Sequence, residues 1–273
     1  MIARTRGVAL LAALLILAAA LAPIPAAYAG IADRAGGTFA LMAGEFVKAF
    51  EPMEGLVVQT DGDAVFLDIG QRRGAQVGQE LTIFRKGEPF RHPLTGKVLG
   101  RYEEVVGYAQ IKRVLPLFSE AVFIPAAGKA QPAAEDGARI TRGRIRVAVT
   151  PVVDLTAAKG DVRRVPYLIA IALERSKRFQ VVDPLAVADA LASSWVRVEE
   201  VLARPERAGA AAKTLEIAGW IVPTLLERAG TTYLDVTWIS AVTATGLFSR
   251  RQPLVPSSTI EEQRFPWEPP AED

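Results

Sequence analysis

The 273-residue chain contains no cysteine and one histidine, and its basic and acidic residues number 32 and 30. Without cysteine it can form no disulfide, no thiolate zinc site, no cysteine nucleophile and no acylated lipoprotein terminus. A single histidine excludes a metal site built from several histidines. A formal net charge of +2 is too even for a protein that binds nucleic acid through phosphate contacts. These absences exclude most common catalytic sites, and we expect no nucleic-acid partner and no cofactor.

The first 29 residues have the layout of a secretory signal peptide. Arg4 and Arg6 precede an uncharged run of about 14 apolar residues from 8 to 21, and residues 27–29 (Ala-Tyr-Ala) fit the cleavage rule. An uncleaved membrane anchor is the alternative, but spanning a bilayer takes roughly 20 residues. We therefore predict a periplasmic protein that meets the membrane only during export. Cleavage leaves 30 of the 32 basic residues against 30 acidic ones, so the mature chain is formally neutral.

Residues 30–51 are predicted to be a leader that contains a helix. Phe39, Met42, Phe46 and Phe50 recur near helical spacing and give the segment one apolar stripe. Such a stripe either packs on a domain of the same chain or binds a groove of a partner protein. The first interpretation is favoured.

Residues 52–126 are predicted to form a small all-β domain, either a barrel or a sandwich. Short alternating strands are separated there by glycine-containing turns. Two of these turns are expected at residues 86–89 (Lys-Gly-Glu-Pro) and 93–96 (Pro-Leu-Thr-Gly). Residues 127–143 are rich in alanine, glycine, proline and charge, and are predicted to be a linker.

Residues 144–256 are predicted to form an α/β sandwich with a mixed sheet, because strands and helices alternate before a run of strands. Asp183 and Pro184 are expected to begin a helix, since aspartate caps and proline fits the first turn. Consecutive strands are expected at residues 220–226, 233–242 and 247–252, with a hairpin at Gly230. Residues 257–273 are rich in proline and acid and are predicted to be a disordered tail. The fold class is therefore α+β.

His92 and the carboxylates near it are the first candidates for catalysis. His92 with Glu88 or Glu103 could supply a general base, but a turn residue of a hairpin is the favoured interpretation. Ser119 lacks a Gly-x-Ser-x-Gly context, which argues against a hydrolase triad. Glu103 and Glu104 could serve an envelope hydrolase. Neighbours on a strand point to opposite faces, however, which argues against a paired acid and base.

The β region also contains three regularly spaced glycines and three aspartates, which are Gly70, Gly74, Gly78, Asp61, Asp63 and Asp68. The glycines are not followed by the Gly-Lys-Ser/Thr of a phosphate loop, and we expect turns with positive φ at these positions. The aspartates lack both the spacing and the closing glutamate of a calcium loop. No catalytic, cofactor-binding or metal-binding residue is therefore predicted.

Tryptophans and one strand suggest binding surfaces rather than chemistry. Trp220 and Trp238 fall on neighbouring predicted strands and are expected in the core or lining a groove, and a glycan or peptide groove is the alternative. Residues 231–242 form a strong β pattern, and an exposed edge there could accept a partner strand.

One stretch of about 70 residues resembles the C-terminal domain of the flagellar assembly protein FlgT. The resemblance runs through residues 54–57 (Glu-Gly-Leu-Val), 83–89 (Ile-Phe-Arg-Lys-Gly-Glu-Pro), 92–100 (His-Pro-Leu-Thr-Gly-Lys-Val-Leu-Gly) and 103–109, and ends near residue 121. The Arg-x-Gly-x-Pro and Pro-x-Thr-Gly-x-x-Leu-Gly signals carry it. Both are strand and turn motifs, so the resemblance implies an assembly role and no catalytic residue.

A second stretch, of about 100 residues, resembles the α/β domain shared by TolB, CsgG-like outer-membrane factors and the middle domain of FlgT. It rests on residues 145–151 (Ile-Arg-Val-Ala-Val-Thr-Pro), 178–184 (Arg-Phe-Gln-Val-Val-Asp-Pro) and 219–222 (Gly-Trp-Ile-Val). FlgT carries its TolB-like domain before its C-terminal one, so the order here is reversed. CsgG-like and penicillin-binding-protein-activator relatives are lipoproteins, whereas this chain has no cysteine to acylate.

Three functional hypotheses follow. The leading one is a non-enzymatic periplasmic protein-binding or assembly factor of the cell envelope, with envelope or flagellar proteins as partners and the flagellar basal body as one candidate location. The alternative is a regulator of peptidoglycan synthesis that binds a synthase through the α/β domain. The third is the envelope hydrolase considered above.

Overall fold

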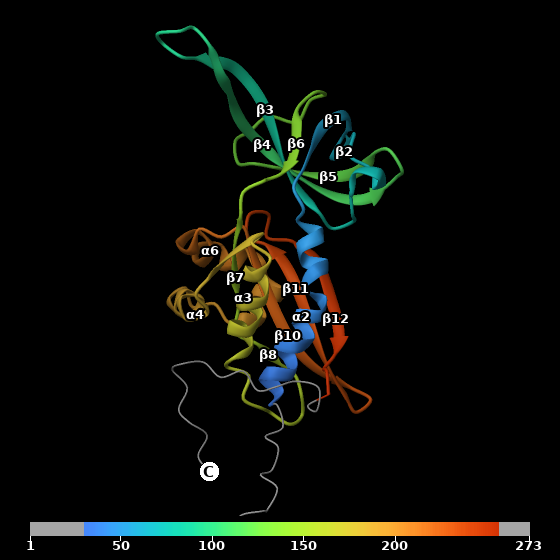
Figure 1. Cartoon of the computed structure of the whole chain (residues 1–273), viewed down its shortest axis with the longest axis vertical. Coiled ribbons are helices and arrows are strands. Elements are labelled where there is room, and N and C mark those ends of the chain that lie inside the picture. Colours follow the sequence, from blue (N-terminus) through green and yellow to red (C-terminus); the bar gives the residue numbers. More distant parts are fainter. Residues whose placement is uncertain (1–29, 257–273) are drawn as a thin grey trace, which may run out of the picture.

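The computed structural model describes residues 30–256, which form two β-sheets with helices around the second (Figure 1). The predicted α+β class is confirmed. The predicted signal peptide (1–29) and tail (257–273) lie outside the described residues. Within 30–256, no helix is both long enough and apolar enough to span a bilayer.

The first sheet is a small barrel-like sheet of antiparallel strands. The strand order is β1-β2-β5-β4-β3-β6, and β6 pairs with both β3 and β1, so the ladder closes on itself. A 3-10 turn, Gln71–Arg73, connects β2 to β3. The strands are β1 (Met53–Asp61), β2 (Ala64–Leu67), β3 (Glu80–Arg91), β4 (Val98–Val114), β5 (Ser119–Pro125) and β6 (Gly137–Ile140).

Strand β6 lies inside the segment that the sequence predicts to be a linker. This short strand packs closely against β3. A Cβ added at Gly137 would stand 2.2 Å from the ring of Phe84 on β3. The glycine lets β6 approach closely enough to close the sheet. The composition of this stretch shows that it is rich in alanine and glycine, but it does not show that the Phe84 ring occupies the space left by the missing Cβ of Gly137.

The predicted turn at residues 86–89 is wrong, and the one at residues 93–96 is confirmed. Strand β3 continues through 86–89, with the pairing register shifting between Lys86 and Pro89. Such an irregularity accommodates glycine and proline without ending the strand. The chain instead turns after His92, whose carbonyl accepts a hydrogen bond from Gly96 N–H at 2.9 Å. Strands β3 and β4 therefore form one long hairpin that projects from the sheet (Figure 1).

The second sheet is mixed, as predicted. Its order is β12-β11-β10-β7-β9, with β8 pairing β10; β9, β7 and β10 are parallel, whereas β10, β11 and β12 are antiparallel. Gly230 makes the hairpin between β10 and β11 with φ of 73°. The strands are β7 (Ile145–Val149), β8 (Val153–Asp154), β9 (Phe179–Val182), β10 (Gly219–Arg228), β11 (Thr231–Ser240) and β12 (Gly246–Pro253).

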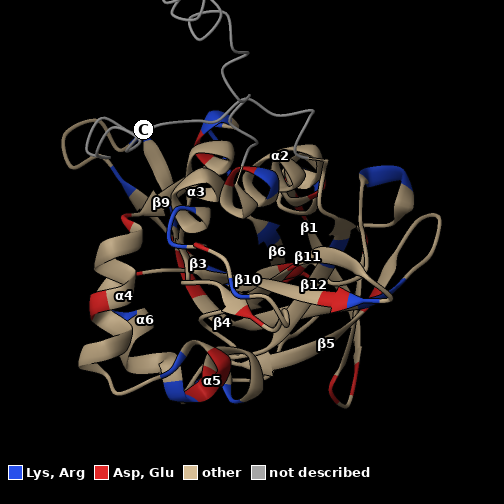
Figure 2. Ribbon diagram, turned by 90° about the horizontal axis from the view of Figure 1, so that it is seen from below, with Lys and Arg blue, Asp and Glu red and all other residues tan. Residues whose placement is uncertain are grey.

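Helices cover both faces of the second sheet. Figure 2 shows α2 and α3 on one side and α4, α5 and α6 on the other. The predicted helix start at Asp183 is confirmed, since its carboxylate accepts a hydrogen bond from Leu185 N–H at 2.9 Å. The helices are α2 (Ile31–Ala49), α3 (Val165–Arg175), α4 (Pro184–Ser193), α5 (Val198–Ala203) and α6 (Gly209–Leu215), with a 3-10 turn at Pro205–Ala208.

The predicted apolar stripe of residues 30–51 packs against the second sheet of the same chain. Phe39, Met42 and Phe46 on α2 are buried, and the Phe46 ring lies 4.9 Å from that of Phe248 on β12. Directly after the helix, the centre of the Phe50 ring lies 4.1 Å from that of Trp238, with the two rings tilted by 39°. The stripe is therefore occupied by the chain's own core, which argues against the alternative that it binds a partner groove. Thus α2 packs with the second sheet, although all strands of the first sheet lie between α2 and β7 in the sequence.

Candidate functional site

His92 is placed in the turn of the β3–β4 hairpin, as the favoured interpretation expects. Its Nδ1 accepts hydrogen bonds from the backbone N–H groups of Leu94 and Thr95, both at 3.3 Å. These bonds fix the ring as a support for the turn. A general base would instead need that nitrogen free to take a proton from a substrate.

Glu103 and Glu104 lie at the base of the same hairpin and pair with different cations. Glu103 pairs with Arg139 at 2.7 Å and Glu104 with Lys129 at 2.9 Å. The hydrogen bond from Lys129 lowers the pKa of Glu104. A general acid of a glycosidase needs a raised pKa, so the lowered pKa does not suit Glu104 to that role.

Ser119 and the three glycines are structural in this fold. Ser119 is fully buried at the start of β5, where no substrate reaches it. The expectation of positive φ is confirmed for Gly74 and Gly78, at 87° and 88°. It is wrong for Gly70, whose φ is −111°. That residue is glycine for another reason: an added Cβ would lie 2.5 Å from the backbone of Leu117 and Phe118.

The three aspartates of the β region do not come together as a metal site. Asp68 accepts a hydrogen bond from Leu56 N–H at 2.6 Å and pairs with Arg73 at 3.1 Å. Asp61 and Asp63 flank Gly62 in the exposed β1–β2 turn. Across residues 30–256, no cluster of histidine, cysteine, aspartate or glutamate is arranged to hold a metal ion.

Trp220 and Trp238 belong to the core of the second sheet, with exposed fractions of 1% and 2%. Trp238 also lines, with Phe50 and Tyr108, a pocket between the two sheets. The opposite case is Trp195, which follows α4 with φ of 55° and is 89% exposed. Trp267 lies outside the described residues.

The expectation that residues 231–242 offer an exposed strand edge is wrong, because β11 pairs with β10 on one side and β12 on the other. The edges of the second sheet are β12 and β9. Arginine side chains cap carbonyls on both: Arg250 Nη1 donates to Ser249 O at 2.9 Å, and Arg144 donates to Phe179 O. Charged side chains of this kind oppose the addition of a further strand.

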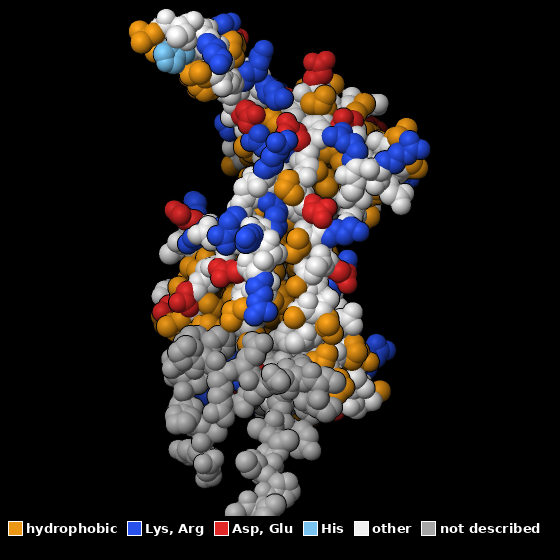
Figure 3. Space-filling view, viewed as in Figure 1, with side chains coloured by type: hydrophobic (Ala, Val, Ile, Leu, Met, Phe, Trp, Pro, Cys, Tyr) orange, Lys and Arg blue, Asp and Glu red, His pale blue; other side chains and the backbone are white. Residues whose placement is uncertain are grey.

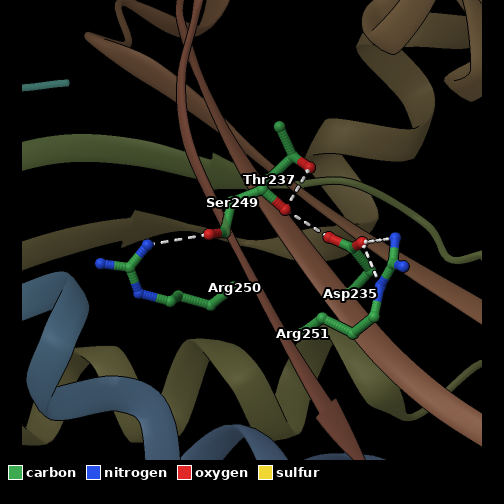
Figure 4. Close-up of polar contacts among 5 residues, drawn as sticks. All are labelled: Asp235, Thr237, Ser249, Arg250 and Arg251. Atoms are coloured by element: carbon green, nitrogen blue, oxygen red, sulfur yellow. Dashed lines mark hydrogen bonds and ion pairs between the residues drawn. The ribbon is translucent and has the colours of Figure 1, made fainter.

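The solvent face of β11 and β12 carries a polar ladder rather than a reactive site. Figure 4 shows Asp235 between two donors, with Arg251 Nε at 2.9 Å from Oδ2 and the Ser249 hydroxyl on the other oxygen. Thr237 continues the ladder by donating to Ser249 at 3.3 Å. Since both carboxylate oxygens are used within the sheet, this row stabilises cross-strand pairing.

The distal part of the β3–β4 hairpin, residues 86–102, exposes several apolar side chains close together; we call it the arm. Phe90 is 40% exposed, Leu99 54%, Tyr102 67% and Leu94 90%. The rings of Phe90 and Tyr102 lie 5.5 Å apart. Monomeric proteins rarely expose apolar side chains together in this way unless another surface covers them.

The arm is also basic. Figure 3 shows hydrophobic and basic side chains gathered at its end. It carries Lys86, Arg91, Lys97 and Arg101 against the single acid Glu88. None of these five side chains forms an ion pair with any residue of 30–256.

The base of the arm is fixed to the second sheet. Glu80, the first residue of β3, accepts hydrogen bonds from Ser240 Oγ at 2.8 Å and Thr243 Oγ1 at 2.7 Å. Gln110 on β4 donates to the same carboxylate at 3.0 Å. Burial raises the pKa of Tyr108, and the neighbouring Glu80 carboxylate raises it further. The end of β11 and the turn that follows it thus form hydrogen bonds with both strands of the β3–β4 hairpin.

Comparison with known proteins gives limited matches. No family model matches the chain. An "Uncharacterized protein" of Aquifex aeolicus (strain VF5) is 36% identical over 83 residues, which are 30% of this chain and 16% of that protein. The chain therefore matches about one sixth of the length of that relative.

The solved structures that are similar belong to LpoB and to a lipoprotein. The LpoB C-terminal domain from Escherichia coli has a TM-score of 0.36 at 12% identity and covers 42% of this chain and 85% of its own. That from Salmonella enterica has a TM-score of 0.33 at 10% identity, covering 41% and 84%. Lipoprotein GNA1162 from Neisseria meningitidis has 0.32 at 13%, covering 43% and 85%. TM-scores and sequence identities this low do not support any transfer of function to this chain. The resemblances to FlgT and TolB stay predictions.

Proposed function

We propose that this protein is a non-enzymatic factor of the bacterial cell envelope that acts in the periplasm by binding other proteins. The observation that carries the proposal is the arm: exposed apolar side chains, and basic side chains that form no ion pair within 30–256, on a hairpin that projects from the body. The signal-peptide pattern of residues 1–29 supports export. The paired carboxylates of Glu103 and Glu104 support binding over hydrolysis.

Two classes of partner are compatible with these features, and we place regulation of peptidoglycan synthesis before flagellar assembly. The α/β domain, through which a synthase would be bound, exposes Trp195 almost completely. Tryptophan is the residue type most enriched among those that dominate binding energy at interfaces. The flagellar alternative rests on resemblance to FlgT, whose two corresponding domains follow the opposite order.

Site-specific photo-crosslinking in the producing bacterium tests the proposal. A photoreactive residue is placed at Trp195, at Tyr102 on the arm, or at Leu41, which is 77% exposed on α2 and serves as the control. Adducts with an envelope protein from Trp195 or Tyr102, but not from Leu41, are expected. A peptidoglycan synthase in the Trp195 adduct supports the first partner class, and a basal-body protein supports the second. Equal adducts from all three positions, or none from any, contradict the proposal.

A functional assay separates the two classes further. Purified full-length protein is added to a peptidoglycan synthase of the same bacterium, and the rate of glycan polymerisation is measured. For the first class, the protein changes the rate and Trp195→Ala removes the effect, whereas Leu41→Ala retains it. No change in rate with the unaltered protein contradicts the synthase assignment and leaves the flagellar class to be tested by motility of a deletion strain.

A further inference from the structure

We propose that the arm inserts into a cleft of a partner protein that is apolar inside and acidic at its rim. This inference rests on the proposed function, because it specifies the partner surface that the arm requires.

Apolar side chains occupy both faces of the arm. Successive residues of a strand point to opposite faces. Gly100 pairs with Phe90 and Val98 with Arg91, so Tyr102 lies on the face of Phe90, and Val98, which is 46% exposed, lies on the other. Phe90 packs against Tyr102 on the first face, and Leu94 in the turn is 90% exposed. A flat partner would cover one face only. A surface that covers both must enclose the ribbon, as a cleft does.

The charges of the arm have no counter-charges within the described chain. The guanidinium groups of Arg91 and Arg101 donate to the carbonyls of Gly96 and Gly87, each at 3.2 Å, and to no carboxylate. At the base of the hairpin, by contrast, Glu103 and Glu104 are already paired. Four basic residues against one acidic residue leave the arm with a formal charge of +3. An acidic rim on the partner supplies the missing charge and steers the encounter.

The backbone favours a protein over a lipid surface. A ribbon of only two strands has open N–H and C=O groups along both outer edges. In hydrocarbon such groups stay unsatisfied, which strongly disfavours insertion, whereas the walls of a protein cleft can pair with them. An isolated two-stranded hairpin is also marginally stable in water. Enclosure by a partner protein pairs the open backbone edges and also stabilises the two-stranded hairpin.

Crosslinking from the two faces, combined with charge reversal, tests the inference in the full-length protein. Photoreactive residues at Val98 and Tyr102 are expected to trap the same protein, and mass spectrometry should place both adducts on peptides that contain aspartate or glutamate. The triple variant Arg91→Glu, Lys97→Glu, Arg101→Glu should lower both adduct yields by about tenfold or more. A matched triple, Arg72→Glu, Lys213→Glu, Arg228→Glu, makes the same change of net charge at exposed sites elsewhere and should leave the yields unchanged.

Three results would overturn the inference. The two faces could trap different proteins, or one face none; the arm triple could leave the yields unchanged; or the unaltered protein could float with phosphatidylglycerol–phosphatidylethanolamine vesicles while the arm triple does not, which identifies a lipid-binding arm. Failure of the inference is distinguishable from failure of the proposed function. Adducts from Trp195 that persist without adducts from the arm retain the proposed function and reject the cleft.

Discussion

Gly137 illustrates how a single residue can decide the closure of a sheet. It lies on β6 beneath the ring of Phe84, and the guanidinium carbon of Arg139 on the same strand lies 4.1 Å from the centre of that ring. Arg139 also pairs with Glu103. The small residue, the aromatic ring and the stacked cation together hold β6 between β1 and β3.

Substituting Gly137 by alanine should therefore destabilise the protein. The added Cβ meets the Phe84 ring at 2.2 Å, and relieving such overpacking typically costs about 1–3 kcal/mol of unfolding free energy. Chemical denaturation measures the change. Gly209→Ala is the control, because nothing lies within 4 Å of its Cβ position on α6 and alanine favours helix by up to about 1 kcal/mol. Equal stability of the two variants would contradict the close-packing argument.

Asp161 provides a prediction about pH. Hydrogen bonds from the Arg163 side chain, at 3.0 and 2.6 Å, lower its pKa to about 2. The folded-state pKa lies below the ordinary value, so the contribution of this pair to folding is present above the ordinary pKa and is lost as pH falls through about 2. Carboxyl-carbon NMR titration should find that midpoint. Arg163→Gln should raise it towards the ordinary value, although the backbone N–H of Arg163 still donates to Asp161. An unchanged midpoint in the variant would refute the assignment.

Single residues were predictable where local chemistry decides their role. The cap at Asp183 and the turns at His92 and Gly230 follow from short-range hydrogen bonding and backbone freedom. The positive φ predicted for Gly70 is wrong, because this position needs glycine for the close approach of the backbone of residues 117–118, which are distant in sequence. The exposure of Trp195 is also not predictable from the sequence, since it depends on how the turn after α4 directs the side chain.

At the scale of elements, α2 is the clearest test of the packing argument. Phe46 is fully buried and contacts the rings of both Phe39 and Phe248. Phe46→Ala should lower the unfolding free energy by about 3–5 kcal/mol, as expected when a core phenylalanine is truncated. Leu41→Ala on the same helix removes a side chain that is 77% exposed and should change stability by less than about 0.5 kcal/mol. Denaturant midpoints compare the two, and a small effect of Phe46→Ala would mean that α2 does not anchor the sheet.

The sequence predicts the existence of most elements but not their partners. Helical spacing identifies α2, and alternation identifies the strands, because both patterns are local. The sequence does not predict the arm, because Gly87 and Pro89 are turn residues in most contexts, whereas here they occupy a register shift of a continuing strand. Strand β11 was expected at an edge because its central position depends on β12 and β10, which only the folded sheet brings together.

At the scale of the whole molecule, the two sheets share one core. Buried side chains of the first sheet, such as Leu67 and Ile83, belong to the same apolar cluster as Phe39 of α2 and Val147 of β7. Polar contacts reinforce this continuity: Gln79 donates to Ala49 O at 3.0 Å, beside the end of α2. The arm and Trp195 are therefore presented by one body, at a fixed separation.

Removing the Glu80 carboxylate should loosen that body. Glu80→Ala removes the acceptor shared by Ser240, Thr243 and Gln110. The buried Ser240 hydroxyl then lacks an acceptor, which costs about 1–3 kcal/mol, whereas Gln110 still donates to Thr245. Because the chain has no cysteine, spin labels at Thr60→Cys on the first sheet and Glu199→Cys on α5 are unique, and pulsed dipolar spectroscopy can read the distance between them. A narrow distribution should broaden in Glu80→Ala and stay narrow in Glu88→Ala, which removes a carboxylate of the arm instead. A broad distribution before any substitution would mean that the sheets already move independently, and a partner could then meet the arm and Trp195 at any separation.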